Sequence, residues 1–206
     1  MTRKLFAIVF TCCAMSLLAQ DAIKVNYKGV NPTICDFAQA LLADNGEEDN
    51  HECEGEAMAA IANAWEHYIK GEPQEEDVTF TVDQRNGYIC YKYIGEEFIN
   101  RIELCYWNEA DQKHKLVACN ITLLDKRGYS VLGQYDGISF YRYNNATKTM
   151  RWYYETGLDK AAPVKDGEWQ TYNLPQAGKN ITVTIWNENG PVTQFPVKWT
   201  GSKFVR

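Results

Sequence analysis

The chain has 206 residues, of which 27 are acidic and 21 basic, and its formal net charge at pH 7 is −6. An acidic chain lacks the surplus of Lys and Arg that neutralises phosphate backbones, so we expect no nucleic-acid partner. The length suits one well-cored domain or two small ones.

The first 20 residues have the layout of a secretory signal. A basic start leads into an apolar run over residues 5–15, and small residues follow around Ala19. The run is too short to span a membrane, and neither of its cysteines ends a lipobox. We therefore predict a signal peptide over residues 1–20, cleaved near Ala19. The mature protein is then exported to the periplasm, the cell surface or the extracellular space, and no later segment predicts a transmembrane span.

Charge is distributed unevenly along the rest of the chain. Residues 21–77 carry 14 acidic and three basic side chains, whereas residues 78–206 carry 13 acidic and 16 basic ones. Solvated helix faces beside an ordinary sheet explain this pattern. The alternative is that the acidic part contacts a basic partner or the basic half of its own chain.

Two amphipathic helices are predicted before residue 71. In the first, Asn31 can cap and Pro32 suits the first helical position. The second ends before Gly71. Apolar residues recur at helical spacing in both: Ile34, Phe37, Ala38, Leu41 and Leu42, then Met58, Ile61, Ala62, Trp65, Tyr68 and Ile69. The two stripes need a common surface to bury against.

Between these helices lies the acidic stretch EEDNHECEGE, residues 47–56. It fails as a calcium loop because glycine is misplaced, and as a zinc helix because a second histidine is missing. A helix junction fits better, since Gly46 can stop one helix and Asp49 can cap the next with Glu52 three residues on. A weak site for a divalent cation is the alternative, and we name no metal ligand.

From residue 78 onward the pattern alternates, which is typical of strands. Asn86 and Gly87 between two such runs indicate a hairpin. Further runs lie at residues 98–107, 115–124, 129–135, 138–143, 149–155, 169–174, 181–186 and 193–199. Tight turns join most of them, and a longer loop is expected at residues 156–168.

These elements predict an α+β fold with two N-terminal helices packed on a large antiparallel meander sheet of about eight to ten strands. The sheet is either open or curled into a partial barrel. We expect a single domain over residues 21–206, with a helical layer at 21–77 and the sheet at 78–206.

Aromatic residues are concentrated in the strands, with 13 Tyr, 6 Trp and 8 Phe in the chain. In the hairpin around NNATK, a five-residue loop pairs Tyr143 with Thr149 and leaves one face outside the core. The ligand-binding candidates on that face, with one ring from a neighbouring strand, are Tyr141, Tyr143, Arg151, Tyr153 and Trp107. Exposed rings of this kind bind a sugar or a protein. Ordinary cross-strand aromatic pairing is the alternative.

No catalytic residue is predicted. The chain has three histidines and no serine elbow, H-E-x-x-H motif or phosphate loop, so no nucleophile has an evident base. Glu96 and Glu97 form a candidate carboxylate pair, although adjacent acids in a turn are usually solvated. The cysteines that follow the signal peptide are Cys35, Cys53, Cys90, Cys105 and Cys119. Their odd number leaves at least one unpaired, and their spacing matches no zinc or haem pattern, so no cofactor is expected.

The leader MTRKLF…SLLAQDA, the tyrosine-rich hairpins and the closing PVKWTGSKFVR, with its W-x-G-x-x-F ending, resemble small exported proteins of unknown function from Gram-negative gut bacteria. The resemblance covers most of the chain. It implies an envelope or extracellular location, and it brings no catalytic residue with it.

We therefore expect a non-catalytic binding protein of the cell envelope whose ligand is a glycan or a protein. Two alternatives remain at this point. One is a surface-polysaccharide hydrolase with paired carboxylates, and the other is a structural component of the envelope whose strand edges pair between copies.

Overall fold

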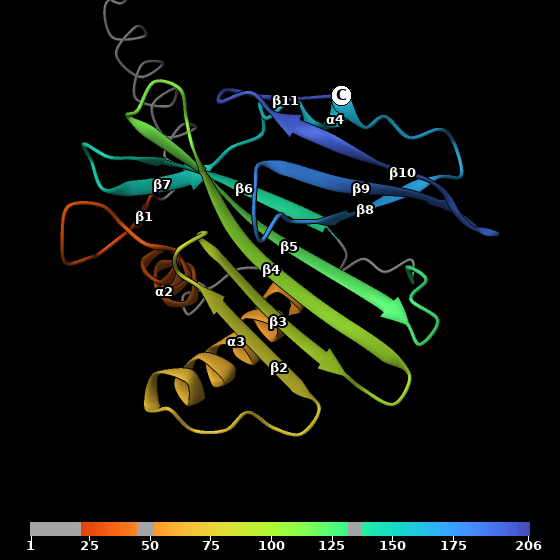
Figure 1. Ribbon diagram of the computed structural model, residues 1–206, viewed down its shortest axis with the longest axis horizontal. Helices are drawn as coiled ribbons and strands as arrows, with labels where there is room; N and C mark the ends of the chain where they lie inside the picture. The colour runs from red at the N-terminus through yellow and green to blue at the C-terminus, as the bar shows by residue number, and fades with distance from the viewer. Residues whose placement is uncertain (1–21, 45–51, 132–136) are drawn as a thin grey trace, which may run out of the picture.

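The structure is a computed structural model that describes residues 22–44, 52–131 and 137–206, with only the backbone for residues 52–58. The predicted signal peptide and the side chains of the acidic stretch, Cys53 included, therefore lie outside the described residues. The fold has two helices near the N-terminus, a seven-stranded antiparallel sheet and a four-stranded antiparallel sheet (Figure 1), and the first short strand of the larger sheet precedes the helices. This arrangement confirms the predicted α+β class.

Helix α2, Ile34–Asp44, begins with a capping box. The Thr33 hydroxyl accepts a hydrogen bond from the Asp36 backbone N–H at 3.4 Å, and the Asp36 carboxylate accepts one from the Thr33 N–H at 2.7 Å. These reciprocal bonds satisfy donors that have no partner inside the helix. Thr33 is therefore the cap, in place of the predicted Asn31.

Helix α3, Glu52–Lys70, ends where the sequence predicts. Gly71 takes a φ of 69°, and the Glu72 N–H reaches back to the His67 carbonyl at 2.9 Å, which closes the last turn. Ile61 and Trp65 are buried, whereas Ile69 is exposed, so the sheet covers a narrower stripe than expected. Within the described ranges, no helix has the length and apolar character needed to cross a bilayer.

The seven-stranded sheet has the order β1-β7-β6-β5-β4-β3-β2. Its strands are β1 (Ile23–Lys24), β2 (Val78–Asp83), β3 (Tyr88–Ile94), β4 (Phe98–Asn108), β5 (His114–Asp125), β6 (Gly137–Asn144) and β7 (Thr149–Trp152). The predicted run at residues 129–135 contributes only an isolated bridge between Leu124 and Ser130, and residues 132–136 lie outside the description.

The remaining strands form a second sheet, in the order β11-β10-β9-β8. They are β8 (Trp169–Asn173), β9 (Asn180–Asn187), β10 (Gly190–Trp199) and β11 (Phe204–Val205). A short helix, α4 (Leu158–Ala161), lies in the predicted loop between the sheets. The strands are thus divided between two sheets where a single meander was expected, and the described strands form no closed barrel.

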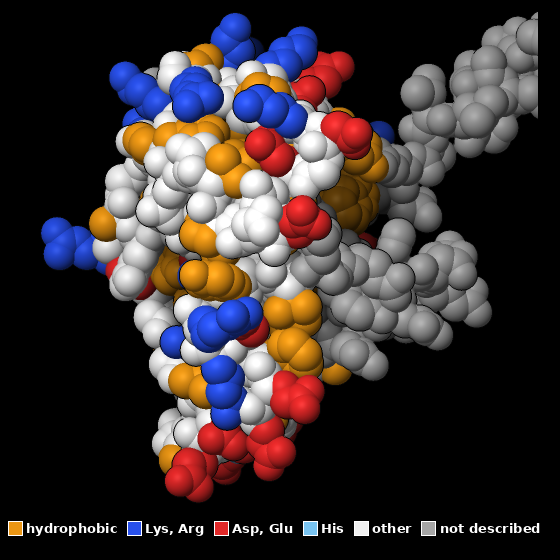
Figure 2. Space-filling model, turned by 90° about the vertical axis from the view of Figure 1, so that its right-hand side faces the viewer, with side chains coloured by type: hydrophobic (Ala, Val, Ile, Leu, Met, Phe, Trp, Pro, Cys, Tyr) orange, Lys and Arg blue, Asp and Glu red, His pale blue; other side chains and the backbone are white. Residues whose placement is uncertain are grey.

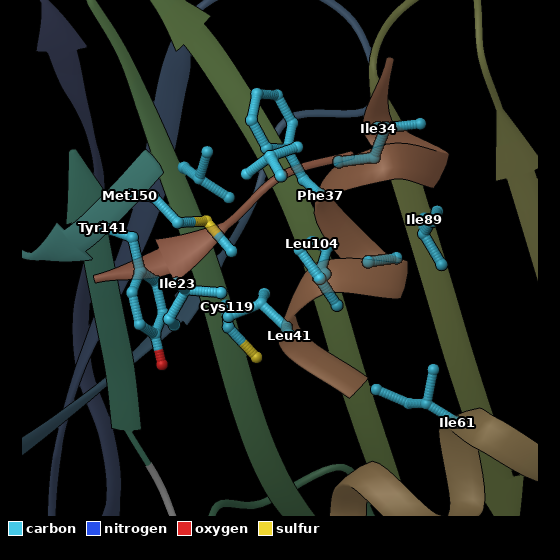
Figure 3. Close-up of a cluster of buried hydrophobic side chains, with 14 of the residues drawn as sticks. Ile23, Ile34, Phe37, Leu41, Ile61, Ile89, Leu104, Cys119, Tyr141 and Met150 are labelled. Carbon is cyan, nitrogen blue, oxygen red and sulfur yellow. The ribbon is translucent and has the colours of Figure 1, made fainter. Parts of the chain in front are cut away.

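Both faces of the seven-stranded sheet are covered (Figure 1). Along β4, Leu104 faces the helices, whereas Cys105 faces the second sheet. Figure 3 shows the helix-side core, where Phe37 and Leu41 of α2 point at the strands. The molecule therefore has three layers, helices, sheet and sheet, with a separate apolar core on each side of the middle layer.

The W-x-G-x-x-F ending fastens the second sheet to the first. Trp199 pairs with Phe204 across the final turn, and the Phe204 ring lies 5.4 Å from the Trp107 ring of β4. Gly201 has a φ of 98°, and its carbonyl accepts a hydrogen bond from the Ala110 N–H at 2.8 Å. A Cβ at Gly201 would lie 3.1 Å from the Ala110 Cβ, so this turn favours glycine. The motif therefore packs the second sheet on β4, where Trp107 contacts both Trp199 and Phe204.

Candidate functional site

The structure places most of the predicted aromatic face inside the protein. Tyr141 and Tyr143 are 6% and 0% exposed and belong to the core beneath the helices. Trp107 is 4% exposed and lies between the two sheets. The prediction that these three rings face solvent is therefore wrong. Arg151 is exposed, and Tyr153 is half-buried.

The turn between β6 and β7 explains part of this error. Tyr143 pairs with Met150 and Asn144 with Thr149, so the loop has four residues where five were predicted. The Asn144 side chain accepts a hydrogen bond from the Ala146 N–H at 2.8 Å, which tightens the turn. Because a shift of one residue changes which side chains share a face, Trp152 lies beside Tyr141 instead of Arg151. The other cause is that both faces of the first sheet are covered, because the helices bury the face with Tyr141 and Tyr143 and the second sheet buries the face with Trp107.

A cleft of about 200 Å³ opens where β6 and β7 meet α4 and β8. We call it the aromatic cleft. Among the residues that line it are Trp152, Tyr153, Tyr154, Asp159, Gln170 and Tyr172. Tyr153 is thus the member of the predicted set that lines this cleft, and the rings on either side of it in sequence line it too.

The short length of β7 produces this cleft. The ladder between β6 and β7 ends at the pair Tyr141–Trp152, and one further hydrogen bond joins the Tyr153 N–H to the Phe140 carbonyl at 2.8 Å. The chain then turns away toward α4. The outer edge of Ile138 and Ser139 therefore has no strand beside it in the described part of the chain, and it forms one wall of the cleft.

Trp152 and Tyr154 form a pair of parallel rings at the cleft, which we call the aromatic platform. Their rings are almost parallel, with an interplanar angle of 10° and centroids 6.4 Å apart. Trp152 is held from behind by Tyr141, whose ring centroid lies 4.6 Å away. Tyr154 is 76% exposed, which is unusual for so large a ring. The buried Tyr141 therefore supports a platform that solvent, or a ligand, can reach.

Polar groups lie beside this platform. The Gln170 amide oxygen is buried without a hydrogen-bond partner among the described residues, and such an acceptor is costly to leave unpaired. Burial raises the pKa of Tyr172, with the charge of Asp159 as a smaller cause, so its hydroxyl stays protonated at neutral pH. Asp159 itself is exposed. The cleft thus combines flat apolar faces with a few hydrogen-bonding groups, as sites for small polar ligands do.

A second cluster, which sequence analysis did not single out, lies at the β4–β5 turn. Glu109, Asp111 and His114 place possible metal-ligating atoms within 4.8 Å of one another. However, Arg142 donates to both oxygens of Glu109, at 2.7 and 2.6 Å, and the Asp111 carboxylate lies 2.6 Å from His114 Nδ1. Because Arg142 already supplies the positive charge, the cluster is an ion-pair network that joins this turn to β6.

The candidate pair Glu96 and Glu97 lies in the tight turn between β3 and β4. Both side chains are exposed and line a shallow pocket with Tyr93 and Phe98. Among the described residues, no third carboxylate lines that pocket. On the face drawn in Figure 2, acidic side chains cluster at the lower end and several basic side chains lie at the upper end.

Comparisons with known protein families, with curated proteins and with solved structures found no match to this chain. Function is therefore inferred from the chemistry of the clefts. The aromatic cleft is the best candidate, because its platform is both exposed and held in place by the core.

Proposed function

We propose that this protein is a non-catalytic, exported binding protein of the cell envelope that holds a glycan in the aromatic cleft. The exposed Trp152–Tyr154 platform is the observation that carries the proposal. A sugar ring has apolar C–H faces and polar edges, so it can lie on an aromatic ring while its hydroxyls meet nearby polar groups. Gln170, Tyr172 and Asp159 lie where those hydroxyls would be.

Two observations favour binding over hydrolysis. Asp159 is the one carboxylate among the described residues that line the aromatic cleft, whereas glycoside hydrolysis ordinarily uses two that flank the scissile bond. The pair Glu96 and Glu97 lies in a separate pocket lined by Tyr93 and Phe98. An envelope location is supported by the leader sequence and by the resemblance to small exported proteins.

The proposal is tested by screening the mature protein on a glycan array and measuring the strongest ligand by isothermal titration calorimetry. We expect Tyr154→Ala to weaken binding by about three- to tenfold, because one aromatic contact is lost. Tyr154→Phe should bind like the wild type, since the ring remains. Tyr93→Ala, which removes another exposed ring, is the matched control and should bind normally.

Tyr154 is exposed, so neither substitution there should change the melting temperature by more than about 2 °C. An array without any bound glycan, or equal loss of affinity in Tyr154→Ala and Tyr93→Ala, would contradict the proposal. Cleavage of the bound glycan during the titration would instead support the hydrolase alternative.

A further inference from the structure

A second cleft, of about 360 Å³, lies between the turn that follows β5 and the outer face of the second sheet. We call it the arginine cleft. The residues that matter here are Arg101, Arg127, Tyr129, Thr171, Thr184 and Trp186. Strand β8 separates it from the aromatic cleft, because Gln170 and Tyr172 line one cleft and Thr171 and Asn173 line the other.

Arg101 is held rigidly at this cleft. Its Nη2 donates to the Tyr172 carbonyl at 3.2 Å and to the Asn173 side-chain oxygen, and its Nε lies 3.4 Å from the buried Glu103 carboxylate. A guanidinium has five N–H donors. Nη2 makes both of these hydrogen bonds, whereas Nη1 and the buried Nε make none within the described residues.

Arg127 lies on the opposite wall of the arginine cleft. Its Nε donates to Asp125 at 2.8 Å, and its guanidinium lies over the Tyr129 ring, 4.9 Å from the centroid. Asp125 and Tyr129 thus fix the position of a side chain that is otherwise mostly exposed. The Nη2 of Arg127 also lies 2.7 Å from the Asp125 carboxylate, so Asp125 occupies the Nε–Nη2 edge of the guanidinium and the Nη1 side remains for a ligand.

Two hydroxyl groups add further donors. Thr171 accepts a hydrogen bond from Trp186 Nε1 at 2.8 Å, and Thr184 accepts one from Gln194 Nε2 at 3.0 Å. Each hydroxyl keeps a proton that it can donate. The described lining residues thus include two guanidinium groups and two hydroxyls, and no carboxylate is among them.

The charge balance limits the kind of anion that fits. Glu103 lies behind Arg101, and Asp125 lies beside Arg127, so the four charges sum to zero. Such a site binds an anion through directed hydrogen bonds and has no surplus positive charge to neutralise a dianion. A group with a single negative charge, such as a carboxylate, suits it better than a phosphate monoester.

We propose that the arginine cleft binds the carboxylate of an acidic sugar. The assumption that the carboxylate belongs to a sugar rests on the proposed glycan-binding function. The two guanidinium groups, together with a described lining that contains no carboxylate, carry the choice of a carboxylate ligand on their own. The protein then prefers glycans that contain uronic acid residues.

The test compares a trimer of galacturonic acid with its methyl ester, which has the same rings without the charge. By calorimetry at pH 7 we expect the free acid to bind at least about tenfold more tightly than the ester, because charge-assisted hydrogen bonds are lost in the ester. Arg127→Gln should remove this preference. Arg85→Gln, in the exposed turn between β2 and β3, is the matched control and should retain it.

Thr184→Val provides a second test that removes one donor while keeping the side-chain shape, and it should reduce the preference severalfold. Melting temperatures show whether each variant is folded. Equal affinity of the acid and the ester, absence of binding by both, or an unchanged preference in Arg127→Gln would overturn the proposal.

These experiments distinguish a failure of the acidic-sugar proposal from a failure of the proposed glycan-binding function. If both trimers bind equally and Tyr154→Ala weakens both, only the acidic-sugar inference is wrong. If the acid alone binds, with Arg127 but not Tyr154 required, the assignment of the glycan to the aromatic cleft is wrong and the arginine cleft is the site.

Discussion

Glu103 is a carboxylate buried between the two sheets, with 3% of its surface exposed. The Tyr88 hydroxyl donates to its Oε1 at 2.8 Å, and Asn120 Nδ2 and the Leu174 N–H donate to its Oε2 at 3.1 and 3.4 Å. Burying a carboxylate is costly unless it is paired in this way. Glu103 in β4 therefore binds groups from β3, from β5 and from the segment that follows β8. Its ion pair with Arg101 also holds that side chain at the arginine cleft.

Two substitutions of Glu103 should distinguish how much its hydrogen bonds and how much its charge contribute to stability. In Glu103→Gln, the amide oxygen can still accept from Asn120 and Leu174, and the Tyr88 hydroxyl can reverse to accept from the amide nitrogen. We expect a loss of about 1–2 kcal/mol in the free energy of unfolding. Glu103→Leu leaves the donors unpaired and should cost about 3–5 kcal/mol. Urea denaturation measures both, and equal losses would contradict this account.

The lowered pKa of Asp111, in the β4–β5 turn, predicts that the free energy of unfolding depends on pH. The hydrogen bond with His114 lowers the pKa of Asp111 from 3.8 to about 2. A carboxyl group whose pKa is lower in the folded state stabilises that state above its unfolded pKa and loses this effect as the pH falls. The advantage of the wild type over Asp111→Asn should therefore be fully present above about pH 5 and be lost as the pH falls through about 4 to below 2. Because the side chain is largely exposed, the advantage stays below about 1 kcal/mol.

The measurement for Asp111 is urea denaturation of both proteins at several pH values. Asp166→Asn, at an exposed aspartate in the α4–β8 loop, is the control and should track the wild type across the same range. A difference that grows as the pH falls would contradict the assigned hydrogen bond.

At the scale of single elements, the start of α2 depends on the Thr33–Asp36 capping box. Thr33→Ala removes the hydroxyl that accepts from the Asp36 N–H, and we expect it to cost about 1 kcal/mol of stability. Thr33→Ser keeps the hydroxyl and should be close to the wild type. Urea midpoints of the two variants test this, and equal midpoints would show that the hydroxyl does not cap the helix.

Elements whose signals are local were predictable from the sequence. The helical stripes, the end of α3 at Gly71 and the hairpin at Asn86 and Gly87 each depend on a few neighbouring residues. The register of β6 against β7 was not predictable in the same way, because it depends on whether Asn144 belongs to the strand or to the loop. That single residue decides whether Trp152 or Arg151 shares a face with Tyr141.

At the scale of the whole molecule, the division into two sheets decides which residues can function. The chain leaves the first sheet after β7 and returns through α4 to build a second sheet on its other face. Nothing local in the sequence marks that departure, since the strands on both sides of it alternate alike. Both clefts lie where segments far apart in sequence meet, so the sequence predicted Tyr153 as a site residue but not Gln170 or Arg101.

Two buried cysteines can report on the two cores separately. Cys105 faces the second sheet, and Cys119 faces the helices, where Leu41 lies close to it (Figure 3). Burial raises the pKa of the Cys105 thiol well above its ordinary value, so little of the reactive thiolate forms. In the native protein we therefore expect iodoacetamide to label both cysteines very slowly.

Core substitutions should change this labelling on one side of the sheet at a time. Phe204→Ala loosens the packing of the second sheet at a cost of about 3–5 kcal/mol, so Cys105 should label faster than Cys119. Leu41→Ala loosens the helical layer and should reverse that order. Peptide mass spectrometry distinguishes the two sites. If both cysteines instead label at equal rates in both variants, the three layers open as one cooperative unit and the two cores are not independent.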